Sequence, residues 1–420
     1  MWKLNRLSKQ ELKSTAKWAA ATILSAQAFA ASTILAVDEH RKRRNPPSGE
    51  FPHHHPLHAR VSDSDITIYT YGADLYRAQL EAIRNAKTSI YFEMFIWKAD
   101  AVGRAFRKAL IEAAERGVQV YIIVDTFGNI NQPWTFRHFP DLPTMHVIRF
   151  PLVRPGILTG SARDKGRDHR KILCVDSEIG FVGGYNIGVH YAKHWRDTHI
   201  RICGPLVWEL ENAFVDMWNL YYHRRKQEPL PDVGSGQWAP VLRASVNSPA
   251  FNSYPVRALY LEAIDRASEK LWITMGYFIP DTGLRQALIN AARRGVDVRV
   301  LVPEYSNHIL ADWVGRPSFT ELLGAGVRIF RYREAMVHAK TMTADGVWST
   351  VGTTNIDRLS MQGNFEVNIE VFDAEMAATL EKIFEMDLTN AYELTAEEWE
   401  QRGTLARIGE TLMRPFAPLI

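Results

Sequence analysis

The sequence predicts an α/β protein built from two related lobes. Residues 75–128 and 256–305 share one order of segments: a helix with periodic apolar residues, an apolar strand, a second helix and a second strand. Each second helix ends in Arg-Gly, at residues 116–117 and 294–295, where glycine suits the left-handed turn that closes a helix. We therefore expect each lobe to be a mixed β-sheet flanked by helices, with the two lobes related by a pseudo-twofold axis.

Composition excludes several classes of protein. The 420 residues are 46% hydrophobic and carry a net charge of +3, so the chain is neither disordered nor a general binder of polyanions. Two cysteines are too few for a disulfide scaffold or a Cys-rich zinc module. One long uncharged apolar run, residues 18–37, is too little for a polytopic membrane protein.

That apolar run organises the N-terminal region, residues 1–60. Twenty helical residues rise about 30 Å, enough to cross a bilayer, so we interpret residues 18–37 as a membrane anchor. Two alternatives stay open: a secretory signal cleaved after Ala28-Phe29-Ala30, and an amphipathic or internal helix. Residues 38–60 read as a basic, Pro-rich linker. Lobe 1 is then expected at 61–240, and lobe 2 at 241–420 with a C-terminal amphipathic helix at 395–413.

A repeated polar motif, His-x-Lys-x4-Asp, stands in the second half of each repeat. The matched positions keep one offset of 169 residues through the motif histidine, lysine and aspartate, a downstream asparagine and a later acidic residue. Packing of a core preserves apolar pattern and does not preserve this polar set, so the two copies indicate a functional site. The pairs are His169 and His338, Lys171 and Lys340, Asp176 and Asp345, Asn186 and Asn355, and Asp197 and Glu366.

The residue types suit chemistry at phosphorus. Histidine and lysine two apart face one way on a strand, and a pseudo-twofold would bring both copies to one cleft at the lobe interface. The two lysines and the amides of Asn186 and Asn355 can bind an anionic phosphoryl group. One histidine can attack phosphorus while the other protonates the leaving oxygen. These side chains supply the charges, so we expect no metal and no cofactor.

Carboxylates are needed to fix the histidine tautomers. Asp197 and Glu366, each 28 residues after its histidine, are the candidates for that role. Asp176 and Asp345 complete the catalytic motifs, but their turn contexts lead us to interpret them as structural or charge-balancing members.

On these motifs the sequence resembles the phospholipase D superfamily over about residues 60–420, and within it the bacterial cardiolipin synthases. The narrower resemblance is carried by residues 168–188, 195–205, 277–281, 293–303, 337–357 and 364–373 and by the C-terminal tail. Thr353 stands where that family usually has serine, which keeps a hydroxyl. The resemblance implies two α/β lobes around a shared cleft and a covalent phosphohistidine. By carry-over His169 is the nucleophile and His338 the acid, although sequence symmetry assigns neither.

The implied reaction transfers a phosphatidyl group between two phosphatidylglycerol molecules, giving cardiolipin and glycerol at a bacterial cell membrane. Expected partners are phosphatidylglycerol and other anionic phospholipids, and no nucleic acid, because the chain is nearly neutral. The alternatives are a phospholipase D that releases phosphatidic acid and a nuclease of the same superfamily. Basic residues near the motifs can meet lipid head groups. They are Arg163, Lys165, Arg167 and Arg170 in the first lobe, and Arg328, Arg331 and Arg333 in the second.

Overall fold

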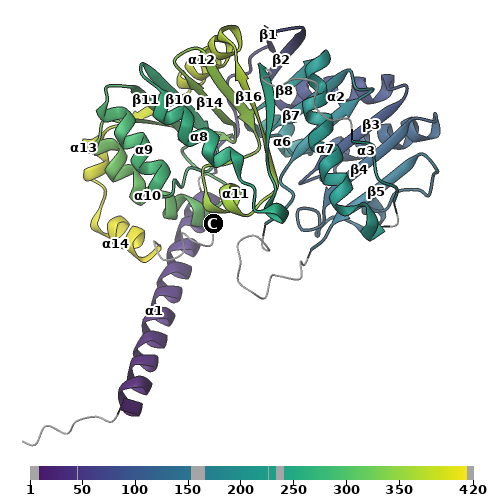
Figure 1. Cartoon of the computed structure of the whole chain (residues 1–420). Coiled ribbons are helices and arrows are strands. Elements are labelled where there is room, and N and C mark those ends of the chain that lie inside the picture. Colours follow the sequence, from purple (N-terminus) through teal and green to yellow (C-terminus); the bar gives the residue numbers. More distant parts are fainter. Residues whose placement is uncertain (1–8, 45, 153–165, 226, 233–240, 414–420) are drawn as a thin grey trace, which may run out of the picture.

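The protein is described here from a computed structural model that covers residues 9–44, 46–152, 166–225, 227–232 and 241–413. The described chain forms two mixed β-sheets flanked by helices, one sheet from each repeat (Figure 1). This architecture confirms the predicted α/β class with two related lobes.

The first lobe follows the predicted order of segments. Its sheet runs β1-β2-β8-β7-β6-β3-β4-β5, and β3, β4 and β5 are parallel. The strands are β1 (Leu57–Val61), β2 (Ser64–Tyr71), β3 (Ser89–Met94), β4 (Gln119–Asp125), β5 (Met145–Phe150), β6 (Lys171–Val175), β7 (Ile179–Gly183) and β8 (Trp195–Cys203). The helices are α2 (Gly72–Asn85), α3 (Ala101–Glu115), α4 (Trp134–Arg137), α6 (Val189–His194) and α7 (Trp208–Tyr221).

The second lobe repeats the plan. Its sheet runs β17-β12-β11-β10-β14-β15-β16-β9, and β10, β11 and β12 are parallel. The strands are β9 (Leu242–Asn247), β10 (Lys270–Met275), β11 (Asp297–Pro303), β12 (Arg328–Tyr332), β14 (Lys340–Ala344), β15 (Trp348–Gly352), β16 (Glu366–Phe372) and β17 (Ala391–Leu394). The helices are α8 (Pro255–Arg266), α9 (Thr282–Arg293), α10 (Ile309–Gly324), α11 (Arg358–Gln362), α12 (Ala374–Leu388), α13 (Ala396–Glu400) and α14 (Thr404–Met413).

Matching residues begin and end the second helix of each repeat. The carboxylates of Asp100 and Asp281 accept hydrogen bonds from backbone N–H groups in the first turns of α3 and α9. Gly117 and Gly295, with φ of 94° and 93°, lie just beyond the ends of these helices, as the Arg-Gly pattern predicts. The same local signals therefore fold both repeats.

The two sheets share a core, and the second repeat contributes one short strand to the first sheet. One apolar cluster joins side chains of both, among them Ile172, Val182 and Ile200 from the first and Val351 and Val367 from the second. The strand β13 (Met336–Val337) belongs to the second repeat by sequence but pairs with β8 of the first sheet. The junction between the lobes is therefore part of the folded core.

The N-terminal helix α1 (Lys9–Arg44) projects from the body and contacts it beside α10 and α14 (Figure 1). Residues 18–37 lie within it. Ala31, Ile34 and Leu35 pack near Val314 of α10, whereas the side chain of Phe29 is 76% exposed. No helix in the described part of the chain is long and apolar enough to span a membrane.

One expectation about the second lobe is wrong in detail. The predicted C-terminal helix at 395–413 is broken into α13 and α14, because the helical pattern passes through Gly403, a residue with poor helix propensity. Thr395 starts α13 with a capping box that includes Glu398. Residues 414–420 of the predicted lobe lie outside the described residues.

Candidate active site

Two strands begin at the motif lysines. Lys171 opens β6 and Lys340 opens β14, and each is paired across the sheet with a methionine that ends the neighbouring strand. Both lysines are fully buried. Lys171 Nζ donates to the carbonyl oxygen of His169 at 2.5 Å, and Lys340 Nζ donates to that of His338. Each lysine is thus held beside its own motif histidine.

Each histidine is hydrogen-bonded to a carboxylate of the other lobe. His169 Nδ1 lies 3.0 Å from both carboxylate oxygens of Glu366, and His338 Nδ1 lies 2.6 Å from Asp197 Oδ2. The equal offset of 28 residues suggested partners within one repeat, and that expectation is wrong. The four residues are buried, so these pairings are screened little by water.

Backbone contacts explain the crossing. The segment that enters the second motif pairs with β8, and His338 N donates to Arg196 O at 2.7 Å, next to Asp197. In the same way, His169 N donates to Phe365 O at 3.0 Å, next to Glu366. The backbone of each motif histidine is therefore hydrogen-bonded to the other lobe, two residues before its own strand begins.

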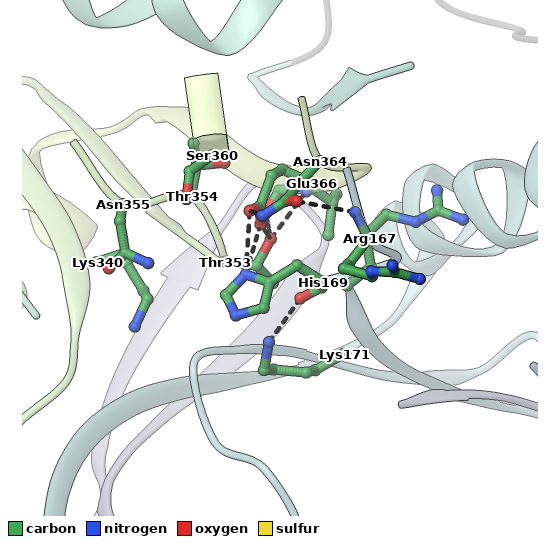
Figure 2. A network of polar contacts seen from close by, with 12 residues as sticks. Arg167, His169, Lys171, Lys340, Thr353, Thr354, Asn355, Ser360, Asn364 and Glu366 are labelled. Atoms are coloured by element: carbon green, nitrogen blue, oxygen red, sulfur yellow. Dashed lines mark hydrogen bonds and ion pairs between the residues drawn. The ribbon is translucent and has the colours of Figure 1, made fainter. Parts of the chain in front are cut away.

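The two carboxylates have different surroundings. Glu366 also accepts hydrogen bonds from Thr353 Oγ1 at 2.5 Å and Asn364 Nδ2 at 3.1 Å (Figure 2). Asp197 accepts from the backbone N–H of Thr198 at 2.7 Å. Its neighbour is Gly184, the repeat equivalent of Thr353, where a Cβ would lie 2.1 Å from Asp197 Oδ1. The larger residue is excluded there because the carboxylate fills its space.

Burial sets the protonation of the site. It lowers the pKa of His169 and lowers that of His338 well below 6.5, and the nearby lysines act in the same direction. Burial also lowers the pKa of Lys171 to about 8 and of Lys340 to about 7, against the attraction of Glu366 and Asp197. Neutral imidazoles beside partly charged lysines are suited to receive a phosphate anion.

A cavity of about 290 Å³ opens onto His169. Asn355 lines it, and its Oδ1 accepts from Tyr277 N at 3.3 Å, which leaves the NH₂ group to donate to a ligand. Figure 2 shows Asn355 and Lys340 across the site from His169. The other wall residues are mainly aromatic, basic and small polar: Phe95, Phe127, Arg167, Tyr277, His308, Leu310, Ala311, Asp357, Leu359, Ser360 and Asn364.

The structure does not bring every predicted residue to this cavity. Asn186 is buried and its Oδ1 accepts from Ile96 N at 3.2 Å, but it is not a wall residue of the cavity. Asp176 and Asp345 lie at the far ends of β6 and β14 from the lysines. Each accepts several backbone N–H groups of the loop before β3 or β10. That placement fits a structural role for the two motif aspartates.

The basic residues near the motifs divide by environment. Arg167 lines the cavity, with its guanidinium 4.8 Å above the ring of Phe127. Arg170 is instead buried in a pair with Glu93 at 2.6 Å, so it cannot meet a lipid. Arg328 pairs with Glu393. Arg163 and Lys165 lie outside the described residues.

Sequence reasoning missed two polar members of the site. Asn364 holds Glu366 and the backbone of Arg167, but its repeat equivalent is Trp195, so comparison of the repeats could not find it. Tyr277 follows β10 and packs edge-on to His338, with ring centroids 5.8 Å apart. A single aromatic residue after a buried strand carries no distinctive signal.

Comparison with known proteins places this geometry in a family. Residues 80–218 and 260–388 match the family model described as cardiolipin synthase, PLD-like domain. The chain belongs to this family. It is 32% identical over 380 residues to a protein of Clostridium perfringens named cardiolipin synthase, covering 85% of this chain and 77% of that one. A Staphylococcus aureus protein of the same name is 33% identical over 371 residues, covering 86% and 74%.

A solved structure extends the likeness to the fold. The crystal structure of a phosphatidylserine synthase from Haemophilus influenzae superimposes with a TM-score of 0.67 at 15% identity, covering 90% of this chain and 97% of that one. The two-lobed arrangement of this cardiolipin synthase-like chain is therefore shared beyond its sequence relatives.

Proposed function

We propose that this protein is a cardiolipin synthase, which transfers a phosphatidyl group from one phosphatidylglycerol to another and releases glycerol. The observation that carries the proposal is the pair of buried histidines. Each is hydrogen-bonded to a carboxylate of the other lobe, and each lies beside a buried lysine. Family membership and the similarity to proteins of that name support the substrate class.

In the proposed first half-reaction, His169 Nε2 attacks the phosphorus of the donor lipid. A P–N bond forms, the P–O bond to the glycerol head group breaks, and His338 gives its Nε2 proton to the leaving oxygen. Phosphate bound between the lysines raises the pKa of His338 and prepares it as the acid. Lys171, Lys340 and Asn355 bind the non-bridging oxygens.

The second half-reaction reverses these roles. A glycerol hydroxyl of a second phosphatidylglycerol attacks phosphorus and gives its proton to His338, while the electron pair of the P–N bond returns to His169. One phosphodiester replaces another, so the exchange needs no nucleotide. Asp197 and Glu366 hold the imidazoles in register and stabilise the cationic ring when it forms.

We also propose that the protein works at a bacterial membrane, because its lipid substrates reside there. Residues 1–60 would attach the chain to the membrane, and residues 61–240 and 241–420 would form the two catalytic lobes. Exposed side chains of α1, including Trp18 and Phe29, and exposed Phe127 beside the cavity support contact with lipid.

The test is to incubate the purified full chain with phosphatidylglycerol vesicles and EDTA, and to follow lipids and free glycerol. We expect equal amounts of cardiolipin and glycerol, and loss of turnover in His169→Ala and in His338→Ala. Phosphatidic acid as the sole lipid product would instead assign a hydrolase, and full activity of either histidine variant would reject the mechanism.

A further inference from the structure

A second cavity lies at the carboxyl ends of the parallel strands β10, β11 and β12. It measures about 240 Å³. Crevices outside the carboxyl ends of parallel strands are where open α/β sheets bind ligands. It adjoins the catalytic cavity, because Tyr277 and Ala311 line both. The proposed mechanism gives this cavity no task, yet the reaction has two lipid substrates.

The equivalent place in the first lobe is nearly closed. There, at the ends of β3, β4 and β5, a cavity of about 40 Å³ remains. Phe136 and Phe139 fill the space, and Arg149 stands where the second lobe has Arg331, by the sheet register. The fold alone therefore does not leave an opening at this position, and the second lobe has one through its own side chains.

The walls of the second cavity combine donors, acceptors and aromatic faces. Arg331 donates through Nη2 to the carbonyl oxygen of Glu304, and its buried Nε has no hydrogen-bond partner among the described residues. Carboxylates also line the cavity, so the charge does not favour a bare phosphate. The charged residues are Asp38, Glu304, Asp312, Arg316 and Arg331, and the aromatic residues include Trp313, Phe319 and Trp399.

This mixture fits an uncharged polyol. Hydroxyl groups both donate to carboxylates and accept from guanidinium groups, and the C–H faces of a polyol can lie on aromatic rings. Arg316 is already paired with Glu410 at 3.1 Å, so it adds little net positive charge for an anion. A glycerol group has the required size and hydrogen-bonding pattern.

The second cavity also adjoins the other histidine. Gly276 lines it and lies against His338, since a Cβ on this glycine would be 3.0 Å from His338 Cα. The catalytic cavity is the one lined by His169. His169 is thus a wall residue of the catalytic cavity, whereas His338 lies behind Gly276, a wall residue of the second cavity.

We infer that the second cavity binds the glycerol head group of the acceptor phosphatidylglycerol, on the side of His338, while the donor phosphate occupies the cavity at His169. This inference rests on the proposed function and assigns the second substrate its place. Arg331 is then a residue that sets acceptor specificity. Because Phe136 and Phe139 fill the matching space in the first lobe, the described residues offer one acceptor site.

The experiment uses the reverse reaction, in which the full-length protein transfers a phosphatidyl group from cardiolipin to free glycerol or to 1-propanol. Arg331→Gln removes the donor, and Arg149→Gln is the matched control in the first lobe. We expect R331Q to raise KM for glycerol about tenfold, because the variant loses a hydrogen bond from a charged donor. Transfer to 1-propanol should be unchanged. R149Q should change neither.

Transfer to 1-propanol reports an intact fold and intact chemistry. An unchanged KM for glycerol in a variant that still uses 1-propanol would overturn the inference. If R331Q loses both reactions, Asp312→Asn is judged by the same criterion. Failure of the wild-type protein to make cardiolipin from phosphatidylglycerol would reject the proposed function, whereas equal glycerol KM values in R331Q and R149Q reject the acceptor site alone.

Discussion

At the scale of single residues, catalysis by this protein is divided between its halves. His169 is oriented by Glu366 and His338 by Asp197, so each motif histidine takes its carboxylate from the other repeat. Glu366 is further held by Thr353 and Asn364, while Asp197 sits against Gly184. The two histidines therefore have similar partners in unequal surroundings, which is what separate roles as nucleophile and acid require.

The crossed pairing makes a direct prediction. Glu366→Gln should reduce kcat by about 10²–10⁴, because the neutral amide no longer stabilises the imidazolium that forms on His169. In ¹⁵N spectra of histidine-labelled protein, this variant should shift the Nδ1 signal of His169. Asp197→Asn should instead shift that of His338.

Each variant serves as the control for the other. A shift of the His338 signal in E366Q, with His169 unmoved, would mean that the carboxylates act within their own repeats and would contradict the geometry.

The sequence predicts these residues but cannot predict which ones meet. The two repeats carry the same spacing, so pairing within a repeat and pairing across repeats leave the same pattern along the chain. Pairing across the repeats is determined by β13, whose two residues join the first sheet just before His338 and bring that histidine to Asp197. Asn364 is also hidden, because Trp195 replaces it in the other repeat.

At the scale of elements, the motif aspartates fasten strands. Asp176 follows β6 in the chain. Its carboxylate accepts hydrogen bonds from the backbone N–H groups of residues 87–89, which lead into β3. Asp345 does the same between β14 and β10. Both adopt positive φ, 55° and 51°, a conformation that aspartate and asparagine tolerate better than most residues. The motif thus joins a site at one end of the strand to a clamp at the other.

Asp176→Asn tests this clamp, since asparagine keeps the positive φ and removes the charge. Partial burial raises the pKa of Asp176, but the hydrogen bonds from the backbone of residues 87–89 together outweigh it and lower the pKa below 3.8. The stabilising effect of the carboxylate is therefore complete above the unfolded pKa and is lost as pH falls through the folded pKa. We expect D176N to lose about 1 kcal/mol of unfolding free energy at pH 7 by urea titration. The difference from wild type should shrink as the pH falls below the unfolded pKa of about 3.9, and it should vanish only below the folded pKa.

Turnover per folded molecule is the control for this variant. A loss of kcat at pH 7 with unchanged stability would assign Asp176 to the chemistry instead.

Local patterns predict elements well where repeat and capping signals agree, as in α3 and α9. They fail where periodic apolar residues continue across a break. The pattern at 395–413 passes through Gly403, and the structure divides it there into two helices. The aromatic segment at 310–319 has no clear helical periodicity and contains Pro317, yet it is helical within α10. It lines both cavities, a position that depends on tertiary packing and not on local sequence.

At the scale of the whole molecule, a buried ion pair joins the lobes next to the active site. Arg196 of β8 meets Asp387 of α12 through two hydrogen bonds of 2.8 and 2.6 Å, and both side chains are almost fully buried. The carbonyl of the same arginine accepts from His338 N. The residue that makes this contact between the lobes therefore also positions the second motif.

Removal of Asp387 should thus affect stability and catalysis together. In Asp387→Ala the buried guanidinium of Arg196 loses its carboxylate partner, and we expect a loss of about 3–5 kcal/mol in unfolding free energy. The kcat for cardiolipin formation should also fall, because the backbone that holds His338 is released. Urea titration and turnover of the folded fraction measure the two effects.

The exposed pair of Arg328 and Glu393 provides the matched control, since its side chains are 42% and 38% accessible. Glu393→Ala should cost at most about 1 kcal/mol and leave kcat unchanged. Replacing both buried partners, Arg196→Met with Asp387→Leu, should recover much of the lost stability, because no unpaired charge remains. Equal stability losses in D387A and E393A would show that the buried pair does not hold the lobes. Loss of stability with kcat retained would separate that pair from the placement of His338.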